Sequence, residues 1–370
     1  MTIKNRVFAT YTSSISCAGN NNEELFDNIS KSRSGIERDN SYFYDAQPAI
    51  GKAFTVQNFN RHLIDQCQNI LDASTLKNFE DTLLVVGSSV GGMNLTEEIF
   101  FRSKNYKEVD PEQHNINSIA HTIKQKFNFY DDISFSTACT SSANAIGYAY
   151  EILSKGLYKN VLVVGADALS RTTVGGFLSL GVLSSDPCKP FDAKRDGMNV
   201  SEAIACLLLE TVPNEQSVEV CGVGYSSDAY HMTHPHPDGD GAQAAMLNAL
   251  KCAQVETDEI DYINAHGTGT IANDSAEANA INSTFRHKPH TSSTKSITGH
   301  TLGAAGALEA IICCMAIEKQ TVPPNTFLDN PENSQVNFAT SLVKNNIRYA
   351  ISNSFAFGGN NCSLVFGKVN

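Results

Sequence analysis

Residues 132–155 read DISFSTACTSSANAIGYAYEILSK, a stretch with a cysteine between two different patterns. The run SFSTA before Cys139 is strand-like, whereas SSANAIGYAYEIL after it carries small, helix-forming residues. The stretch therefore predicts a strand, a sharp turn and a helix, with Cys139 at or just before the helix N-terminus. There the helix macrodipole and unpaired N–H groups favour a thiolate, so we expect the pKa of Cys139 to be lowered by about one unit or more. The alternative is a small buried apolar residue, because buried cysteines are common.

The same alternation of strands and helices recurs along the chain and predicts an α/β fold. The polar, proline-containing segment 211–217 predicts a seam between two similar α/β halves, residues 1–212 and 213–370. In the first half the predicted strands are RVFATYT near the start, 81–89, 132–138 and 160–167, and the predicted helices are 112–127 and 141–155. In the second half they are a strand at 218–227, helices at 241–255 and 303–320, a strand running into a glycine turn at 259–270, and two strands around a GG turn at 349–369.

The composition is that of a globular protein and argues against several classes of function. Hydrophobic residues make up 41% and charged residues 18% of the 370 residues, which is not the pattern of a disordered chain. The formal net charge of −12 argues against nucleic-acid binding, which needs a basic surface. The ten cysteines form no CxxC pair, so a zinc framework is not expected, and free thiols indicate a reducing compartment. With no signal-peptide pattern and no long apolar stretch, we expect a cytoplasmic protein without a membrane span.

Three further stretches carry residues suited to catalysis. His266 in NAHGTGT and His300 in KSITGHTLGAAGALEA both lie in glycine-containing turns, in the half that lacks Cys139. A nucleophilic cysteine with distant histidine partners is a known catalytic pattern. The paired glycines of SFAFGGNN (354–361) allow backbone N–H groups to point toward an oxyanion, although a simple hairpin turn explains them equally well. Taken alone, each histidine is also compatible with an ordinary core or surface position.

Two other stretches resemble ligand sites without meeting their requirements. The stretch HMTHPHPDGD (231–240) places three histidines beside aspartates, but their spacing fits no helix face, so we predict no metal there. The stretch GSSVGGM (87–93) lacks the GxGxxG spacing and the downstream acidic residue of a dinucleotide loop. The sequence therefore predicts no bound metal and no nucleotide cofactor.

The order of TACTSS, NAHGTGT, SSTKSITGHTLGAAGALEA and NSFAFGGNN along the chain resembles that of the elongating β-ketoacyl-acyl-carrier-protein synthases. These are the Cys-His-His condensing enzymes of fatty acid and type II polyketide synthesis. The resemblance extends to GSSVGGM, VGADALS, KPFDAKRDG, GYSSDAYHMT and PPNTFLDNP, almost from end to end. It implies a thiolase-like fold of two similar α/β halves in a five-layer αβαβα arrangement. In that fold the N-terminal half carries the nucleophile and the C-terminal half the catalytic histidines.

The resemblance also implies a reaction. Cys139 takes an acyl group from an acyl carrier protein, malonyl-carrier protein then loses its carboxylate, and the enolate attacks the Cys139 thioester. The product is a β-ketoacyl chain two carbons longer. In this interpretation His266 and His300 donate hydrogen bonds to the enolate oxygen, with Lys295 beside them. The backbone N–H groups of Cys139 and Phe357 stabilise the oxyanion.

Further residues match family positions with supporting roles. Glu309, on an otherwise apolar helix, is expected to pair with Lys295, because a buried carboxylate needs a partner. The remaining matches are Asp228 on a mobile active-site loop, Thr268 and Thr270 as residues that hold the phosphopantetheine arm and malonyl group, Val90 in the acyl pocket, Phe357 as a gating aromatic, and Arg195 with Lys194 as residues that dock the carrier protein.

Departures from the family pattern leave the pathway and the partner open. The segment NVSEAIACLLLE (199–210) stands where many members have a glycine-rich stretch, Ala356 replaces a usual glycine, and ANDSAE (272–277) lacks the usual glycine before Asp274. These features are similar to those of specialised type II pathways such as aryl polyene pigments. The partner is a second copy of the chain or a paralogous ketosynthase or chain-length factor. The alternative function is that of a chain-length-factor-like subunit with a mainly structural role, although such subunits usually lack the nucleophile. Substrates would arrive on the phosphopantetheine of acyl carrier protein, with no other cofactor.

Overall fold

This computed structural model describes residues 5–43 and 45–369, and four of their strands form two small sheets, β2 (Ile36–Arg38) with β3 (Ala49–Gly51) and β11 (Thr321–Val322) with β12 (Val343–Lys344). The other ten strands pair into one continuous sheet. Each half of the chain supplies five neighbouring strands. The first half supplies β1 (Phe8–Ser16), β4 (Thr82–Gly87), β5 (Asp131–Phe135), β6 (Asn160–Asp167) and β7 (Ala203–Glu210). The second half supplies β8 (Val218–Ser227), β9 (Tyr262–Asn264), β10 (His290–Ser292), β13 (Tyr349–Phe355) and β14 (Asn360–Lys368).

The two sets of five strands have the same topology. Numbered within each half, the order across the sheet is 3-2-4-5-1, as β5-β4-β6-β7-β1 and as β10-β9-β13-β14-β8. In each set the first three strands of this order are parallel and the other pairs are antiparallel. The sets join through two residue pairs, Phe8 with Glu219 and Ala9 with Val218. The two similar α/β halves expected from the sequence are therefore confirmed.

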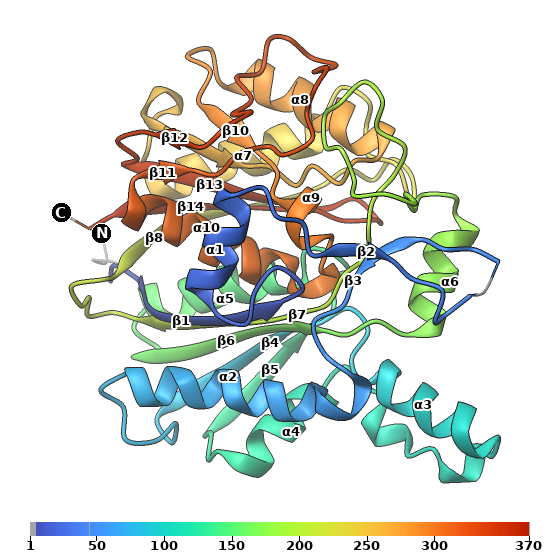
Figure 1. Cartoon of the computed structure of the whole chain (residues 1–370). Coiled ribbons are helices and arrows are strands. Elements are labelled where there is room, and N and C mark those ends of the chain that lie inside the picture. Colours follow the sequence, from blue (N-terminus) through green and yellow to red (C-terminus); the bar gives the residue numbers. More distant parts are fainter. Residues whose placement is uncertain (1–4, 44, 370) are drawn as a thin grey trace.

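Helices cover both outer faces and also fill the space between the two sets of strands (Figure 1). One outer layer is α2 (Phe59–Ala73) and α4 (Ser118–Lys126), which share a core with β4 and β6. The opposite outer layer is α7 (Asp240–Ala253) and α8 (Ile271–Thr284), which share a core with β13 and β14. Between them lie α5 (Ser141–Ser154) and α10 (Ala305–Lys319) in the largest core. The predicted αβαβα arrangement is confirmed.

The two central helices approach each other closely because small residues lie at their contact. A Cβ added at Gly306 would lie 2.6 Å from the backbone nitrogen of Ala143. The hydroxyl of Ser142 accepts a hydrogen bond from the backbone nitrogen of Ala307 at 2.9 Å. Nearly every residue of α10 is buried, as expected for a helix that is apolar on all sides. This contact fixes the two helix N-termini relative to each other.

Most predicted elements match the structure, and one boundary does not. The helix expected over residues 112–127 begins only at Ser118, after a short 3₁₀ turn at Pro111–Gln113. The segment 211–217 connects β7 to β8, where the seam was expected. No helix in the described part of the chain is long and apolar enough to cross a membrane. The other elements used below are α3 (Met93–Ser103), α6 (Arg171–Ser179) and α9 (Lys295–Thr298).

Candidate active site

Cys139 lies in a strained turn between β5 and the central helix α5. The preceding residue, Ala138, has a φ of +53°, a left-handed conformation that is uncommon for a residue with a side chain. The turn is held by hydrogen bonds from the Thr140 hydroxyl to the Thr137 carbonyl, at 2.7 Å, and from the Ser141 hydroxyl to the Ala138 carbonyl, at 2.6 Å. Backbone strain that surrounding contacts fix is typical of functional sites. The side chain of Cys139 is thereby directed from the helix N-terminus toward the second half of the chain.

The structure brings both predicted histidines to Cys139. The His300 Nε2 atom lies 3.0 Å from the Cys139 Sγ atom. The rings of His266 and His300 are perpendicular, with their centroids 5.2 Å apart. His266 follows β9 and His300 follows the short helix α9, so elements of both halves meet at this point. The predicted juxtaposition of these three side chains is confirmed.

A buried ion pair lies directly behind the histidines. The Lys295 ammonium pairs with the Glu309 carboxylate and lies 3.4 Å from Nδ1 of His266. The side chains of Lys295 and Glu309 are only 1% and 3% exposed. The predicted pairing of these two residues is confirmed, and it places a positive charge beside the imidazoles in a water-poor environment.

Burial determines the protonation of the three reactive groups. Burial, reinforced by the Lys295 charge, lowers the pKa values of His266 and His300 well below the usual range, so both rings are neutral at pH 7. Burial also raises the pKa of the Cys139 thiol to about 11, although the Lys295 charge and the Phe357 N–H oppose the shift. The lowered cysteine pKa expected from the sequence is therefore wrong. The thiol is protonated at neutral pH, and His300 is the neutral base within reach of its proton.

Three buried carboxylates that sequence analysis did not single out for the site fix the turns around it. Glu277 accepts hydrogen bonds from the backbone nitrogens of His266 and Gly267, at 2.8 and 2.7 Å, and burial raises its pKa to about 7. Asp167 accepts from both Ser88 and Ser89 and from the backbone of Gly303. The third is Asp274, which binds the backbone of residues 268 and 269. The sequence does carry a signal for these three carboxylates, since each acidic residue lies among small residues near a strand end or in the first turns of a helix. A carboxylate buried there needs hydrogen-bond donors.

A narrow cavity of about 40 Å³ leads to the three reactive side chains. Its lining includes the predicted residues Asp228, Thr268, Thr270 and Phe357. The hydroxyls of the two threonines are 2.9 Å apart. These residues therefore lie along the approach to Cys139, His266 and His300.

The loop that carries Asp228 is tied to the GG turn at the cavity. The Asp228 carboxylate accepts from the Asn361 amide at 2.6 Å and from the His236 backbone nitrogen at 3.2 Å. The backbone nitrogen of Gly358 donates to the Met232 carbonyl at 2.8 Å. Gly358 and Gly359 have φ values of +87° and +78°, which the glycines of the predicted hairpin turn allow. Hydrogen bonds therefore link the two segments directly.

Val90 and Phe357 belong to one apolar cluster beside the cavity. They pack with Met198, Leu302 and Phe177, and the rings of Phe177 and Phe357 are 6.2 Å apart between centroids. The expected role of Val90 in an acyl pocket stays a prediction. Phe177, Met198 and Phe357 all line the cavity, so this apolar cluster borders it directly.

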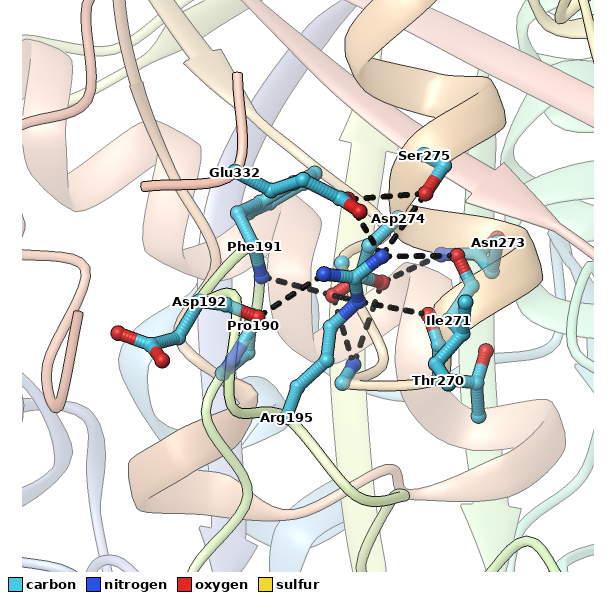
Figure 2. Close-up of polar contacts among 12 residues, drawn as sticks. Pro190, Phe191, Asp192, Arg195, Thr270, Ile271, Asn273, Asp274, Ser275 and Glu332 are labelled. Carbon is cyan, nitrogen blue, oxygen red and sulfur yellow. Dashed lines mark hydrogen bonds and ion pairs between the residues drawn. The ribbon is translucent and has the colours of Figure 1, made fainter. Parts of the chain in front are cut away.

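The predicted carrier-docking role of Arg195 is contradicted by its position. Arg195 is only 5% exposed, and all three nitrogens of its guanidinium donate hydrogen bonds within the chain (Figure 2). A docking residue must present its charge to the partner, and this one does not. The neighbouring Lys194 is exposed, so its predicted docking role is open. The match to the family motif identified the arginine, but a motif does not show whether a side chain is buried.

The donor atoms of Cys139, His266 and His300 lie within 4.8 Å of one another, and this is the one group of three or more such ligands among the described residues. In the stretch 231–240, His231 and His234 are close, at 3.1 Å between Nδ1 atoms, but belong to no such group in the described chain. The described residues with metal-ligand spacing are therefore those that the resemblance assigns to acyl transfer.

Comparisons with known proteins agree with this arrangement. Residues 52–214 match the family model "Beta-ketoacyl synthase, N-terminal domain", and residues 217–329 match "Beta-ketoacyl synthase, C-terminal domain". The 3-oxoacyl-[acyl-carrier-protein] synthase 2 of Coxiella burnetii is 36% identical over 311 residues, which cover 77% of this chain and 75% of the relative. The enzyme of the same name from Vibrio cholerae is 35% identical over 312 residues, again 77% of this chain and 75% of the relative.

Solved structures with the same fold include complexes of two different subunits. One is the ketosynthase ApeO in complex with its chain length factor ApeC from Xenorhabdus doucetiae, with a TM-score of 0.88, 30% identity, and coverage of 99% of this chain and 98% of that one. Another is the ishigamide ketosynthase/chain length factor, with a TM-score of 0.90, 27% identity, and coverage of 99% and 100%. On these matches to both halves, and with Cys139 and two histidines gathered at one cavity, the chain belongs to the β-ketoacyl synthase family of condensing acyltransferases.

Proposed function

We propose that the chain condenses an acyl group, taken from an acyl carrier protein onto Cys139, with malonyl-acyl carrier protein. The observation that carries the proposal is the contact between the Cys139 thiol and the neutral His300 ring, with His266, Lys295 and Glu309 behind it. The product is a β-ketoacyl-carrier protein two carbons longer than the primer.

In the first step the Cys139 sulfur attacks the carbonyl carbon of the acyl thioester. Since the pKa of the thiol is raised to about 11, its proton must leave as the bond forms, and His300 Nε2 at 3.0 Å is positioned to accept it. The tetrahedral intermediate carries a negative oxygen, which the backbone N–H groups of Cys139 and Phe357 would stabilise. One such donor contributes on the order of 10²–10³ in rate. The carrier thiol then leaves with the proton, and the acyl group remains on Cys139.

In the second step malonyl-carrier protein binds in the cavity and its carboxylate leaves as CO₂. The two electrons of the broken carbon–carbon bond form an enolate, and its oxygen needs hydrogen-bond donors. The neutral imidazole of His266 carries one N–H that can serve, and His300 can serve in the tautomer that carries its proton on Nε2, the atom that faces Cys139. The buried Lys295 adds a nearby positive charge. The enolate carbon then attacks the Cys139 thioester, and the sulfur is released as a thiolate, which takes up one proton from solvent to restore the thiol. No metal is needed for any of these bonds to form or break.

The proposed partners are the acyl carrier protein and a second subunit, either another copy or a paralogous ketosynthase or chain-length factor. The heterodimeric structures that share this fold support the second possibility. The sequence departures at 199–210 and at Ala356 favour a specialised, aryl-polyene-like type II pathway over housekeeping fatty acid synthesis. We also propose a cytoplasmic location, which suits the ten free cysteines.

Intact-mass spectrometry tests the proposal directly. The protein and its Cys139→Ala variant are incubated with a panel of acyl-carrier proteins, and malonyl-carrier protein is then added. We expect an acyl adduct on the native chain only, followed by its loss as β-ketoacyl-carrier protein appears. If the folded protein takes up no acyl group alone, but gains this activity with a paralogous partner, the heterodimer is the functional unit. A protein that stays unacylated under both conditions would have the alternative, mainly structural role.

A further inference from the structure

We propose that Arg195 is a positioning residue that fixes the loop 268–271 against the N-terminal half of the chain, so that Thr268 and Thr270 face the passage to Cys139. The inference rests on the proposed function in one respect, which is that these threonines contact the pantetheine-linked substrate. It replaces the carrier-docking role that the family resemblance suggested for the same residue.

The guanidinium of Arg195 binds the backbone of the loop at its carbonyl oxygens (Figure 2). Its Nε donates to the Thr270 carbonyl at 3.3 Å and its Nη2 to the Ile271 carbonyl at 3.0 Å. The Nη1 atom donates to the carbonyl of Asp192, in the loop that carries Arg195 itself, at 2.9 Å. One planar group thus links the segment 192–195 of the first half to the start of α8 in the second. A lysine has neither the planar shape nor the number of donors for this.

Asp274 holds the same loop by its N–H groups. Its carboxylate accepts from the backbone nitrogens of Thr268 at 2.9 Å and Gly269 at 3.1 Å, and from that of Phe191 in the first half at 2.8 Å. The carboxylate also lies 3.8 Å from Nε of Arg195, and the side chains of both residues are almost completely buried. The N–H groups of the loop are therefore bound by the negative Asp274, and its carbonyl oxygens are bound by the positive Arg195.

Two residues complete the cluster on the side that faces solvent. The Nη2 atom of Arg195 donates to the Ser275 hydroxyl at 2.8 Å and to the Glu332 carboxylate at 2.6 Å, and Ser275 donates to the same carboxylate at 2.9 Å. Glu332 is half-exposed and closes the cluster from outside. The positive charge of Arg195 is thus neutralised from two sides, which leaves none of it for an acidic partner.

The loop geometry shows why such a clamp is needed. Gly269 has a φ of +85°, and a Cβ at this position would lie 2.6 Å from the carbonyl oxygen of Gly197, in the first half. The glycine lets the two halves touch, but it also makes the loop backbone flexible. Arg195 and Asp274 offset that freedom, and the hydroxyls of Thr268 and Thr270 are held 2.9 Å apart at the cavity.

The test compares Arg195→Met with Arg61→Met, since Arg61 is exposed on α2 and pairs with Asp65 one turn away. Each variant is assayed with malonyl-carrier protein and with malonyl-pantetheine, which has the arm but no protein. We expect Arg195→Met to raise KM for both substrates by about tenfold, as for loss of a positioned hydrogen bond, with the same loss at low and high salt. Arg195→Lys should restore only part of the effect, whereas Arg61→Met should change neither value.

The proposal is overturned if Arg195→Met weakens only the carrier-borne substrate in a salt-dependent way, which would show docking, or if it changes neither KM. Should this variant fail to fold, the double variant Ser275→Ala/Glu332→Gln decides, since it keeps Arg195 and removes two of its partners. We expect it to raise KM for malonyl-pantetheine severalfold, and an unchanged KM would sink the proposal. A wild-type protein that turns over neither substrate, alone or with a paralogous partner, would instead refute the proposed function.

Discussion

The Lys295–Glu309 pair offers a quantitative test of how the site is built. Both side chains are almost completely buried, so removing one partner leaves the other charge without compensation. Breaking a buried ion pair in this way typically costs about 3–5 kcal/mol, whereas replacing both partners costs much less. We therefore expect Lys295→Met and Glu309→Gln each to be strongly destabilising. The double variant should be less destabilised than the sum of the two single effects predicts.

This free-energy change converts into a measurable temperature shift. With an unfolding entropy of about 2.1 cal/mol/K per residue, 370 residues give about 0.8 kcal/mol/K, so 3–5 kcal/mol lowers Tm by about 4–6 °C. The double variant should lie at least about 4 °C above the value expected from adding the two single shifts.

Differential scanning calorimetry at one scan rate measures Tm for the wild type, the two single variants and the double variant. Glu23→Gln is the matched control, because it breaks a largely exposed pair with Lys319 at 2.9 Å and should shift Tm by less than about 1 °C. Strict additivity of the two single variants would refute the reasoning, since it would mean that the two charges do not interact in the folded protein.

Three further outcomes follow from the geometry. The rate of alkylation of Cys139 by iodoacetamide should rise about tenfold per pH unit between about pH 7 and 10, because a thiol with a pKa of about 11 is mostly protonated below that pH. Peptide mass spectrometry measures this rate, and a plateau near neutral pH would contradict the raised pKa. Gly306→Val should lower Tm, because overpacking against Ala143 costs about 1–3 kcal/mol or more; an unchanged melting curve would show that the central helices separate easily. Asp228→Ala should speed amide hydrogen exchange in both 232–236 and 356–359, whereas faster exchange in only one segment would mean that the two are not coupled.

Much of the fold and the centre of the site could be predicted from the sequence. The strand at 218–227 and the buried helix near 305–319 were readable because apolar patterns are local properties. Cys139 and His300 were readable because each lies in a distinctive turn next to small residues. The Lys295–Glu309 pair followed from the rule that a carboxylate on an apolar helix needs a partner, together with the family resemblance that placed Lys295 near the histidines.

The predictions that were wrong depend on the burial of side chains, which a sequence motif does not encode. Arg195 was expected at the surface, yet it is enclosed by a loop far away in sequence and by Glu332. The pKa of Cys139 was expected to fall at a helix N-terminus, but desolvation by residues from the other half outweighs that effect. Asp167 and Glu277 went unnoticed because many of their partners are backbone N–H groups, and every residue except proline offers one.

The repeated strand order has a consequence for how such a protein can change. Cys139 follows the third strand of its half and His300 follows the third strand of the other, so the 3.0 Å contact joins corresponding connections of two equivalent units. The α5–α10 contact and the strand pairing involve neither reactive atom. Scaffold and chemistry are thus separable, and a copy that had lost its sulfur would keep the same shape. Division of labour between an active and an inactive copy therefore requires no new architecture.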